Sequence, residues 1–469
     1  MKINFRKLDD INLYLLVLMG FFIPLSTAAT NVILGLILLS WIFDSISDRF
    51  QRWVLVLKSN PVAFMGLIVF LIHATGILYT DAGKEKILES LMDGAKFLFI
   101  ALAMMYFKDK QYHSRLLFSF SLAMGITLLL SCLLWINRLP GFIPVKGNPL
   151  DCNVFLNHIA QNLFMAYMAF LAAVQARTAN GYGQKMLWAV FSLLALFNVL
   201  FMVGGMTGHL VAGALFLYFF LSWDRTKSLI VAGLVFLIFG AFAWMNPLNS
   251  IFLRSKTAIA EIKAWEYGKK ASSQSSSGLR LEFYSNTVKI IKINPVLGTG
   301  TGSFENAYRS LTEKTGMNPT DNPHNEYLMT TAQFGFVGLA VLLGFFRVQW
   351  YSAGFFEDST QTIMARGFVL AILFAAMVSS PLQDNAEGWF FALMSAHLFA
   401  GPATGGRYFG KRGQVLYQRF ARVQFPADKI SKLVKIFFFK MQFSIFIEGA
   451  FKICKGNDKS GPSVQTPQF

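Results

Sequence analysis

The chain has 469 residues, of which 54% are hydrophobic and only 14% charged, and phenylalanine alone occurs 49 times. A soluble domain carries about a quarter charged residues, so composition excludes a soluble enzyme. The net charge of +17 does not indicate nucleic-acid binding, because from Arg407 onward 12 Lys/Arg stand against 3 Asp/Glu. A basic tail beside a membrane span is typical of contact with anionic lipid.

Apolar runs long enough to cross a hydrocarbon core of roughly 30 Å recur along the chain. The first could belong to a signal peptide, but a second follows at once, which favours a membrane hairpin. The sequence therefore predicts an all-α integral membrane protein with about twelve transmembrane helices. The runs lie near residues 12–28, 29–44, 62–78, 94–107, 116–136, 154–174, 187–204, 209–223, 229–245, 324–346, 367–380 and 387–400.

Basic residues fall in alternate short loops, which sets the orientation of the spans. Lys/Arg-rich loops face the cytoplasm, and this rule places both termini there and the long connection outside. The loops concerned contain Arg49/Arg52/Lys58, Lys108/Lys110/Arg115, Arg177/Lys185, Arg225/Lys227 and Arg347/Arg366.

Four segments follow from this topology. Residues 1–245 form an N-terminal membrane bundle of about nine helices, 246–323 an external loop, 324–400 three further helices, and 401–469 a basic amphipathic tail in the cytoplasmic interface. A structureless loop as long as 246–323 would be unusual, so it is expected to fold over the outer face.

The loop contains a helical pattern that Pro295 ends. A serine-rich stretch at 271–278 before it predicts a flexible linker, and residues 251–270 are expected to form another helix at the membrane surface. The apolar positions of the pattern are Leu281, Tyr284, Val288 and Ile291.

The three cysteines do not suggest a disulfide framework. Cys132 lies in an apolar run, Cys152 in a connecting loop and Cys454 in the tail, which the topology puts in three different environments. No Cys or His partner stands at metal-ligand spacing either, so no metal is expected.

The stretch NPHNEYL (322–328) stands at the mouth of the tenth run and is the most informative part of the sequence. A histidine at this position meets external water, and its ordinary pKa near 6.5 suits a general base at neutral pH. His324 is therefore a candidate catalytic residue. The alternative is an interfacial histidine satisfied by a neighbouring carbonyl group.

Arg280 follows the serine-rich linker at the start of the loop helix. A guanidinium beside a helix N-terminus suits binding of a phosphate or pyrophosphate, although a solvated arginine paired with Glu282 is the alternative. Arg254 and other basic residues make the loop generally cationic. The strip GTGTG (298–302) lacks the spacing and βαβ context of a dinucleotide site, so it is interpreted as a turn delivering Phe304 and Tyr308 to the next segment.

Two clusters of acids lie at the outer ends of the runs, and either could serve acid–base chemistry or hold a divalent metal. The alternative, which we favour, is ordinary polar residues at a membrane surface. His73 is expected to make a helix–helix hydrogen bond. The clusters are Asp81, Glu85, Glu89 and Asp93, and Asp384, Asn385 and Glu387.

At this point the chain resembles the O-antigen ligase/polymerase family. The resemblance is carried by GTGTGSF (298–304), HNEYL (324–328) and GFVGL (335–339), and in motif it spans roughly residues 190–345. It implies about twelve helices with one large helical periplasmic loop, a fold like that of GT-C membrane glycosyltransferases, in the bacterial inner membrane with the active site facing the periplasm.

The resemblance also implies an activity. Ligases of this family transfer a glycan from undecaprenyl pyrophosphate to a sugar hydroxyl of the lipid A core, by an inverting reaction without metal, nucleotide or other cofactor and with no obligate protein partner. His324 matches the family's loop histidine, and Arg280 matches its loop arginine. Asn325, His209 and Arg254 are further candidates for substrate binding.

The family's second functional arginine is missing. Family members usually read RTG or RSG where the eighth helix starts, whereas this chain reads GMTGH (205–209), with methionine at 206. Methionine cannot ion-pair with a pyrophosphate, so His209 or another loop cation is expected to substitute, or else the chain is an inactive form.

Other functions stay open at this stage. An O-antigen polymerase would use a second lipid-linked glycan as acceptor, and a protein-glycosylating relative is a further possibility. A transporter or flippase also commonly has twelve helices, but tends to carry ionisable residues inside them and broken segments in matching halves. A structural scaffold would not need His-Asn at the mouth of a span.

Overall fold

The computed structural model describes residues 5–42, 46–107, 110–223, 276–313 and 320–400, with a few single positions between 226 and 237. These residues form helices and connecting loops, and only one isolated bridge, between Asn148 and Asp151, has strand-like pairing. The predicted all-α class is therefore confirmed for the described part of the chain. The expected helix at 251–270, the first part of the serine-rich linker, Arg254 and the basic tail lie outside it.

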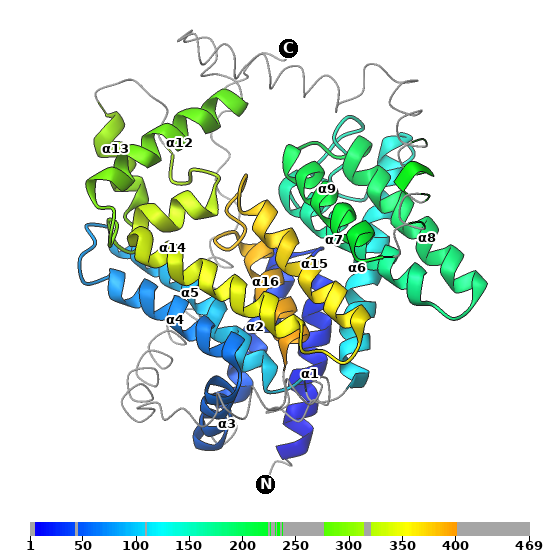
Figure 1. Cartoon of the computed structure of the whole chain (residues 1–469), viewed down its shortest axis with the longest axis horizontal. Helices are drawn as coiled ribbons and strands as arrows, with labels where there is room; N and C mark the ends of the chain where they lie inside the picture. Colours follow the sequence, from blue (N-terminus) through cyan, green and yellow to red (C-terminus); the bar gives the residue numbers. More distant parts are fainter. Residues whose placement is uncertain are drawn as a thin grey trace.

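Each predicted apolar run within the described residues corresponds to a helix, but several bounds differ, and α5 begins at Lys84 rather than near residue 94 (Figure 1). Their bounds are α1 Phe5–Phe22, α2 Thr27–Ile42, α3 Ile46–Ser59, α4 Pro61–Gly76, α5 Lys84–Met104, α6 Lys110–Trp135, α7 His158–Thr178, α8 Tyr182–Phe197, the π-helical turn η1 Asn198–Met202, α9 Met206–Leu221, α12 Ser276–Ile293, α13 Phe304–Thr312, α14 Glu326–Ala353, α15 Ser359–Ala375 and α16 Asn385–Phe399.

Four helices in the described residues are long and apolar enough to cross a membrane, and a fifth span is possible if the bent pair α3–α4 counts as one. The remaining apolar helices are shorter, and the predicted run at 229–245 falls almost wholly outside the described residues. The expectation of about twelve spans is therefore not confirmed, although the multi-pass character is. The four long segments are Ser114–Trp135, His158–Thr178, Tyr182–Met202 and Glu326–Ala353.

Two groups of helices pack around a shared core. One group joins α4, α5 and α14, and the other joins α7, α8, α9 and α15. Helix α7 is apolar on all sides, as expected of a helix enclosed by others, and every residue from Ala160 to Val174 is buried. Helices α12 and α13 lie at the end of the molecule opposite the start of α1 (Figure 1). The loop subdomain and the first helix thus mark opposite ends of the bundle.

The end of the bundle near the start of α1 is closed by a polar cluster that the sequence did not predict. Residues 46–59, expected as a loop, form the amphipathic helix α3, which meets α4 at 102°. Arg52 makes a bidentate pair with Asp9 at 2.7 and 2.9 Å, and buried Arg49 donates to the hydroxyl of Tyr106 at 3.1 Å. Two of the basic residues used to set orientation therefore also hold together α1, α3 and the turn that follows α5.

The cysteine prediction needs a correction. Cys132 packs against the small apolar cluster that contains Cys152, so the two thiols share one environment rather than two. Both are free. The loop that carries Cys152 folds back onto the end of η1, where the Cys152 amide donates to Met202 O at 2.9 Å, and sequence separation gave no sign of this return.

Candidate functional site

The loop helix α12 confirms the predicted helix but changes its buried face. Its described residues run from Ser276, within the predicted linker, to Ile293, before Pro295. The buried apolar residues are Phe283, Ile290 and Ile291, whereas Val288 is 40% exposed. The helix is therefore rotated relative to the predicted face.

Helices α12 and α13 share a small apolar core with the start of α14. Phe283 stands edge-on to Tyr308 at 6.0 Å, and both pack with Phe304, Met329 and other residues of this cluster. Phe304 and Tyr308 are thus delivered to the loop core by the turn at 298–302, as the sequence predicted. The loop subdomain consequently rests on the first turns of α14, the helix that follows His324.

A lysine at the start of α5 fixes the loop to the bundle. Lys86 Nζ lies 3.3 Å from Glu89 and from Glu305 on α13, and 3.6 Å from Asp321, three residues before His324. Exposed pairs of this kind contribute little each, but here one cation joins three segments. Of the first acidic cluster, Glu89 therefore takes part in the contact between the loop and the bundle.

The glycine-rich strip 298–302 supplies hydrogen-bond partners at a break in α14. At Gly335 the helix adopts φ 63° and ψ −167°, which interrupts its hydrogen-bond ladder. The amides of Thr299 and Gly300 donate to Ala332 O and Gln333 O at 2.9 and 2.8 Å, and Pro295 O accepts from the amide of Phe336 at 2.8 Å. In a membrane helix the freed backbone groups must find such partners.

No amide of residues 298–303 is left to hold a phosphate. Beyond those of Thr299 and Gly300, Gly298 donates to Asn294 O, Thr301 to Gly76 O, Gly302 to Gln333 Oε1 and Ser303 to Gly300 O. The strip is a clamp between α4 and α14, and these contacts confirm that it is a turn rather than a phosphate loop.

His324 stands at the mouth of α14 with an unusual backbone. Its φ is 55°, in the left-handed region that costs an ordinary residue roughly 1–2 kcal/mol. Its amide donates to Asn322 Oδ1 at 2.7 Å, while its carbonyl oxygen lies 3.2 Å from the hydroxyl of Tyr284 on α12. Within the described residues no hydrogen bond is made to its imidazole, whose ring lies 6.3 Å from that of Phe283.

The electrostatics of this mouth couple His324 to Arg280. Partial burial and the positive charge of Arg280 both lower the pKa of His324, and Asp321 opposes them. Arg280 also acts on Tyr284, whose pKa burial raises, so that this hydroxyl stays protonated. Among the described residues no hydrogen bond or ion pair occupies the Arg280 guanidinium, and the pairing with Glu282 considered above is not formed.

Asn325 caps α14. Its Oδ1 accepts from Leu328 N at 3.0 Å, and its Nδ2 donates to Met377 O at 2.8 Å. Asparagine is a favoured N-cap, so the structure gives this residue a local reason to be present. Its predicted role in substrate binding stays a prediction.

His209 and Met206 lie in the first turn of α9. The ring nitrogens of His209 stand 2.9 and 3.1 Å from the carbonyl oxygens of Gly205 and Leu200, at the junction of η1 and α9. Met206, at the position of the absent family arginine, is 49% exposed. The substrate-binding role of His209 stays a prediction, and Arg254 lies outside the described residues.

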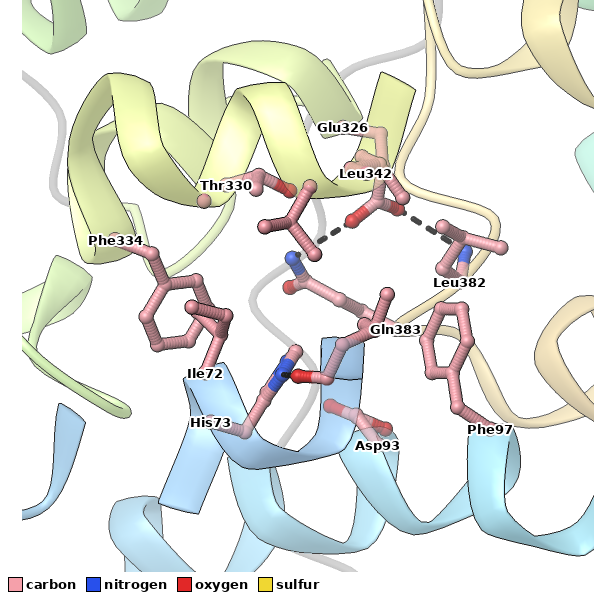
Figure 2. A pocket seen from close by; sticks show the side chains of 13 residues that line it. Ile72, His73, Asp93, Phe97, Glu326, Thr330, Phe334, Leu342, Leu382 and Gln383 are labelled. Carbon is pink, nitrogen blue, oxygen red and sulfur yellow. Dashed lines mark hydrogen bonds between the residues drawn. The ribbon is translucent and has the colours of Figure 1, made fainter. Parts of the chain in front are cut away.

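A cavity of about 30 Å³, lined in part by His73, Asp93 and Glu326, lies where α4, α5 and α14 meet (Figure 2). It is large enough for about one water molecule. Glu326 accepts from Leu382 N at 3.0 Å and from Gln383 Nε2 at 3.3 Å, which fixes the segment before α16 against the first turn of α14.

The two acidic clusters meet around one lysine. Lys96 Nζ donates to Asp93 at 2.7 Å and to the carbonyl oxygen of Asp384 at 3.1 Å. No group of three His, Cys, Asp or Glu side chains that could hold a metal ion occurs in the described part of the chain. Asp81, Glu85 and Glu89 are exposed, as expected of polar residues at a surface, whereas Glu387 is buried.

His73 does not make the expected helix–helix hydrogen bond through its ring. Its Nδ1 lies 3.0 Å from Val69 O in its own helix, and its ring packs at 4.5 Å on that of Phe334. Its carbonyl oxygen accepts from the hydroxyl of Thr301 in the strip 298–302, so His73 joins α4 to the strip through its backbone.

Sequence reasoning missed Asn322, Tyr284 and Ser380 as supports of His324. It also missed Lys96 and Glu326 as the buried groups that hold the segment before α16. Lys96 did carry a signal, since a lysine inside an apolar run marks a required polar contact. Glu326 stood within the NPHNEYL stretch. No pattern in the sequence brought Ser380 next to Asn322, because 58 residues separate them and the contact depends on tertiary packing.

A comparison with known protein families matches the region that contains the candidate site. Residues 190–343 match the family model described as O-antigen ligase. No curated protein matches the chain. The matched stretch contains Arg280, the strip 298–302, His324 and the break at Gly335. The match supports the assignment of this chain to the O-antigen ligase family.

The helices and the matched region point to the same class. The described part of the chain has the apolar helices of a multi-pass membrane protein, and residues 190–343 are similar to O-antigen ligases, which are glycosyltransferase-like enzymes.

Proposed function

We propose that this protein is an O-antigen ligase that transfers a glycan from undecaprenyl pyrophosphate to a sugar hydroxyl of the lipid A core. The observation that carries the proposal is the pairing of His324 with Arg280 at the mouth of α14. In the described residues neither side chain is engaged by a hydrogen bond or ion pair, and the charge of Arg280 lowers the pKa of His324. A base and a cation held together suit a reaction that removes a proton and releases a pyrophosphate.

The proposed step is a single displacement. His324 accepts the proton of the acceptor hydroxyl while its oxygen attacks the anomeric carbon of the donor sugar. The bond from that carbon to the pyrophosphate oxygen breaks, and undecaprenyl pyrophosphate leaves with the electron pair. Arg280 neutralises the charge that develops on the leaving group, and attack from the opposite side inverts the anomeric configuration. Arg254 and His209 are proposed as further donor contacts, because Met206 supplies no charge.

The lowered pKa of His324 supports its role as the base. Partial burial and Arg280 keep the imidazole neutral, and a neutral imidazole is the form that can accept a proton at physiological pH. The same arginine thus prepares the base and holds the leaving group, which suits a site that needs no metal ion.

The test is transfer of an undecaprenyl-pyrophosphate-linked glycan to purified lipid A core by the purified protein, in EDTA and without nucleotide. The proposal expects a lipid A core product of inverted anomeric configuration. A product formed only when a second lipid-linked glycan is the acceptor would assign the protein as the polymerase instead. Absence of any product with both acceptors would contradict glycan transfer.

We also propose that the loop subdomain faces the periplasm, from the Lys/Arg asymmetry of the short loops. With the three native cysteines replaced by serine, cysteine at exposed Glu313 should react with an impermeant thiol reagent in spheroplasts, and cysteine at exposed Gln51 should not. The reverse pattern would overturn the orientation and the position of the site.

A further inference from the structure

His324 combines a catalytic side chain with a backbone conformation that it does not adopt readily. Its φ of 55° is one of two positive values at non-glycine residues in the described chain. Such a conformation persists only where the surroundings impose it, and it commonly marks a functional position. The contacts that impose it are therefore of interest in their own right.

The first contact comes from two residues upstream and from the loop before α16. Asn322 Oδ1 accepts the amide of His324 at 2.7 Å and the hydroxyl of buried Ser380 at 2.8 Å. Pro323, which stands between Asn322 and His324, has a fixed φ and so restricts the conformations that this turn can adopt. One oxygen atom thus ties the turn that carries His324 to the bundle.

The second contact comes from the loop helix. The Tyr284 hydroxyl on α12 lies 3.2 Å from His324 O and 3.3 Å from Met377 O. Met377 O also accepts from Asn325 Nδ2 at 2.8 Å. The Tyr284 hydroxyl therefore connects the loop helix α12 to His324 and to the residue that follows α15.

We propose that Asn322, Ser380 and Tyr284 are positioning residues that hold His324 in its left-handed conformation, with its imidazole beside Arg280. The amide side of His324 is fixed by the bundle, and its carbonyl side is fixed by the loop helix. Docking of α12, which carries Arg280 one turn before Tyr284, is thereby coupled to the placement of the base. The inference rests on the proposed function of His324.

A positioning role predicts a kinetic signature that a stability role does not. If these contacts aim the base, their loss lowers kcat and leaves the KM for the lipid-linked donor unchanged, since displacement of a catalytic group by about 1 Å can cost on the order of a hundredfold. If they only stabilise the fold, the loss appears in the amount of folded protein and not in its turnover.

The experiment compares Asn322→Ala, Ser380→Ala and Tyr284→Phe in the glycan-transfer assay, with folded protein quantified by thermal unfolding in detergent. We expect kcat to fall by about tenfold to a hundredfold in Asn322→Ala and by less in the two hydroxyl variants, with unchanged donor KM. Ser380→Ala removes one oxygen atom and keeps the test valid if Asn322→Ala does not fold.

Asn322→Asp is the conservative variant. Aspartate keeps an acceptor for both the His324 amide and Ser380, so kcat should stay within a few-fold of wild type while Asn322→Ala loses turnover. Its added charge joins Asp321 in opposing Arg280, so the acid limb of the pH–rate profile should move to higher pH. An Asn322→Asp variant as impaired as Asn322→Ala at every pH would contradict positioning through this acceptor.

Tyr308→Phe is the matched control for Tyr284→Phe. Its hydroxyl accepts from Asn286 at 3.1 Å in the same loop core but contacts neither His324 nor Met377, so kcat should be retained. Equal loss in both variants would reassign the effect to the loop core. If His324→Ala is inactive while all three positioning variants keep wild-type kcat, this inference fails alone. If His324→Ala is active, the proposed base fails.

Discussion

Two segments that meet α14 use their polar groups in opposite ways. In the strip 298–302 every backbone amide donates to a defined acceptor, and the strip closes the gap left by the break in α14. At the mouth of the same helix the backbone of His324 is held as firmly, but its imidazole and the nearby Arg280 guanidinium are left unengaged by the described residues.

The comparison separates scaffold from chemistry. A glycine-rich strip suggests phosphate binding on sight, yet its donors are already committed, so it cannot bind an anion without breaking α14. The unengaged groups lie instead on side chains whose own backbones are fixed. A catalytic group needs an unengaged side chain on a fixed backbone, because a mobile backbone would not keep that side chain oriented toward the substrate.

The largest effect is expected at the mouth, from His324→Ala. Loss of a general base costs roughly a hundred- to ten-thousand-fold in turnover. His324→Asn is the matched variant, since asparagine tolerates the left-handed conformation better than alanine and should fold at least as well while remaining inactive. The rate of glycan transfer per folded protein decides, and wild-type turnover in either variant would end the claim that this residue is the base.

A smaller loss is expected from Arg280→Ala. Removal of one group that stabilises transition-state charge typically costs about a hundredfold or more, and kcat/KM for the donor should show it. Arg280→Lys should recover only part, because lysine lacks the planar fork. Lys292→Ala, which removes an exposed cation from the far end of α12, serves as the control. Equal loss in both would indicate general attraction of an anionic lipid.

At the break in α14 that the strip covers, the corresponding change should affect folding and not chemistry. Gly335 has a positive φ, and an added Cβ would collide with the carbonyl group of Val296. Gly335→Ala should therefore destabilise by more than the roughly 1–2 kcal/mol of backbone strain alone, seen as a lower Tm in detergent with unchanged turnover per folded molecule.

Gly344→Ala is the control in the same helix. Its Cβ would meet only the end of Met65 at 3.4 Å, and alanine favours a helix over glycine by about 0.5–1 kcal/mol. Its Tm should not fall. A Gly335→Ala variant of wild-type stability would contradict the assignment of the strip as a clamp.

The apolar periodicity predicted where the helices lie, because apolar runs and Pro295 report directly on local structure. It could not predict contacts between segments that are distant in the sequence. Nothing local to Asn322 reveals that Ser380 donates to it, and nothing in the loop pattern shows that Phe283 rather than Val288 faces the core. His324 was found because its position at a span mouth is itself a local feature, whereas its supports depend on how α12, α14 and α15 meet.

The smallest effect concerns the acidity of the base and tests whether the mouth behaves as an electrostatic unit. A base works when neutral, so turnover falls as the pH drops through its pKa, and the lowered pKa of His324 predicts an acid limb below pH 6.5. Asp321 raises that pKa, so Asp321→Asn should move the limb to lower pH, whereas Arg280→Gln should move it to higher pH.

The control and the salt dependence make this last prediction specific. Asp321 is exposed and its influence is screened, so the shift from Asp321→Asn should be a fraction of a pH unit and should shrink as salt is added. Glu89→Gln weakens the same Lys86 contact without acting on His324 and should leave the limb in place. Both Asp321→Asn and Glu89→Gln remove one partner of Lys86. A difference between their acid limbs therefore reports the effect of the Asp321 charge on the His324 imidazole. Limbs that move together would show that the profile reports docking of the loop and not the ionisation of His324.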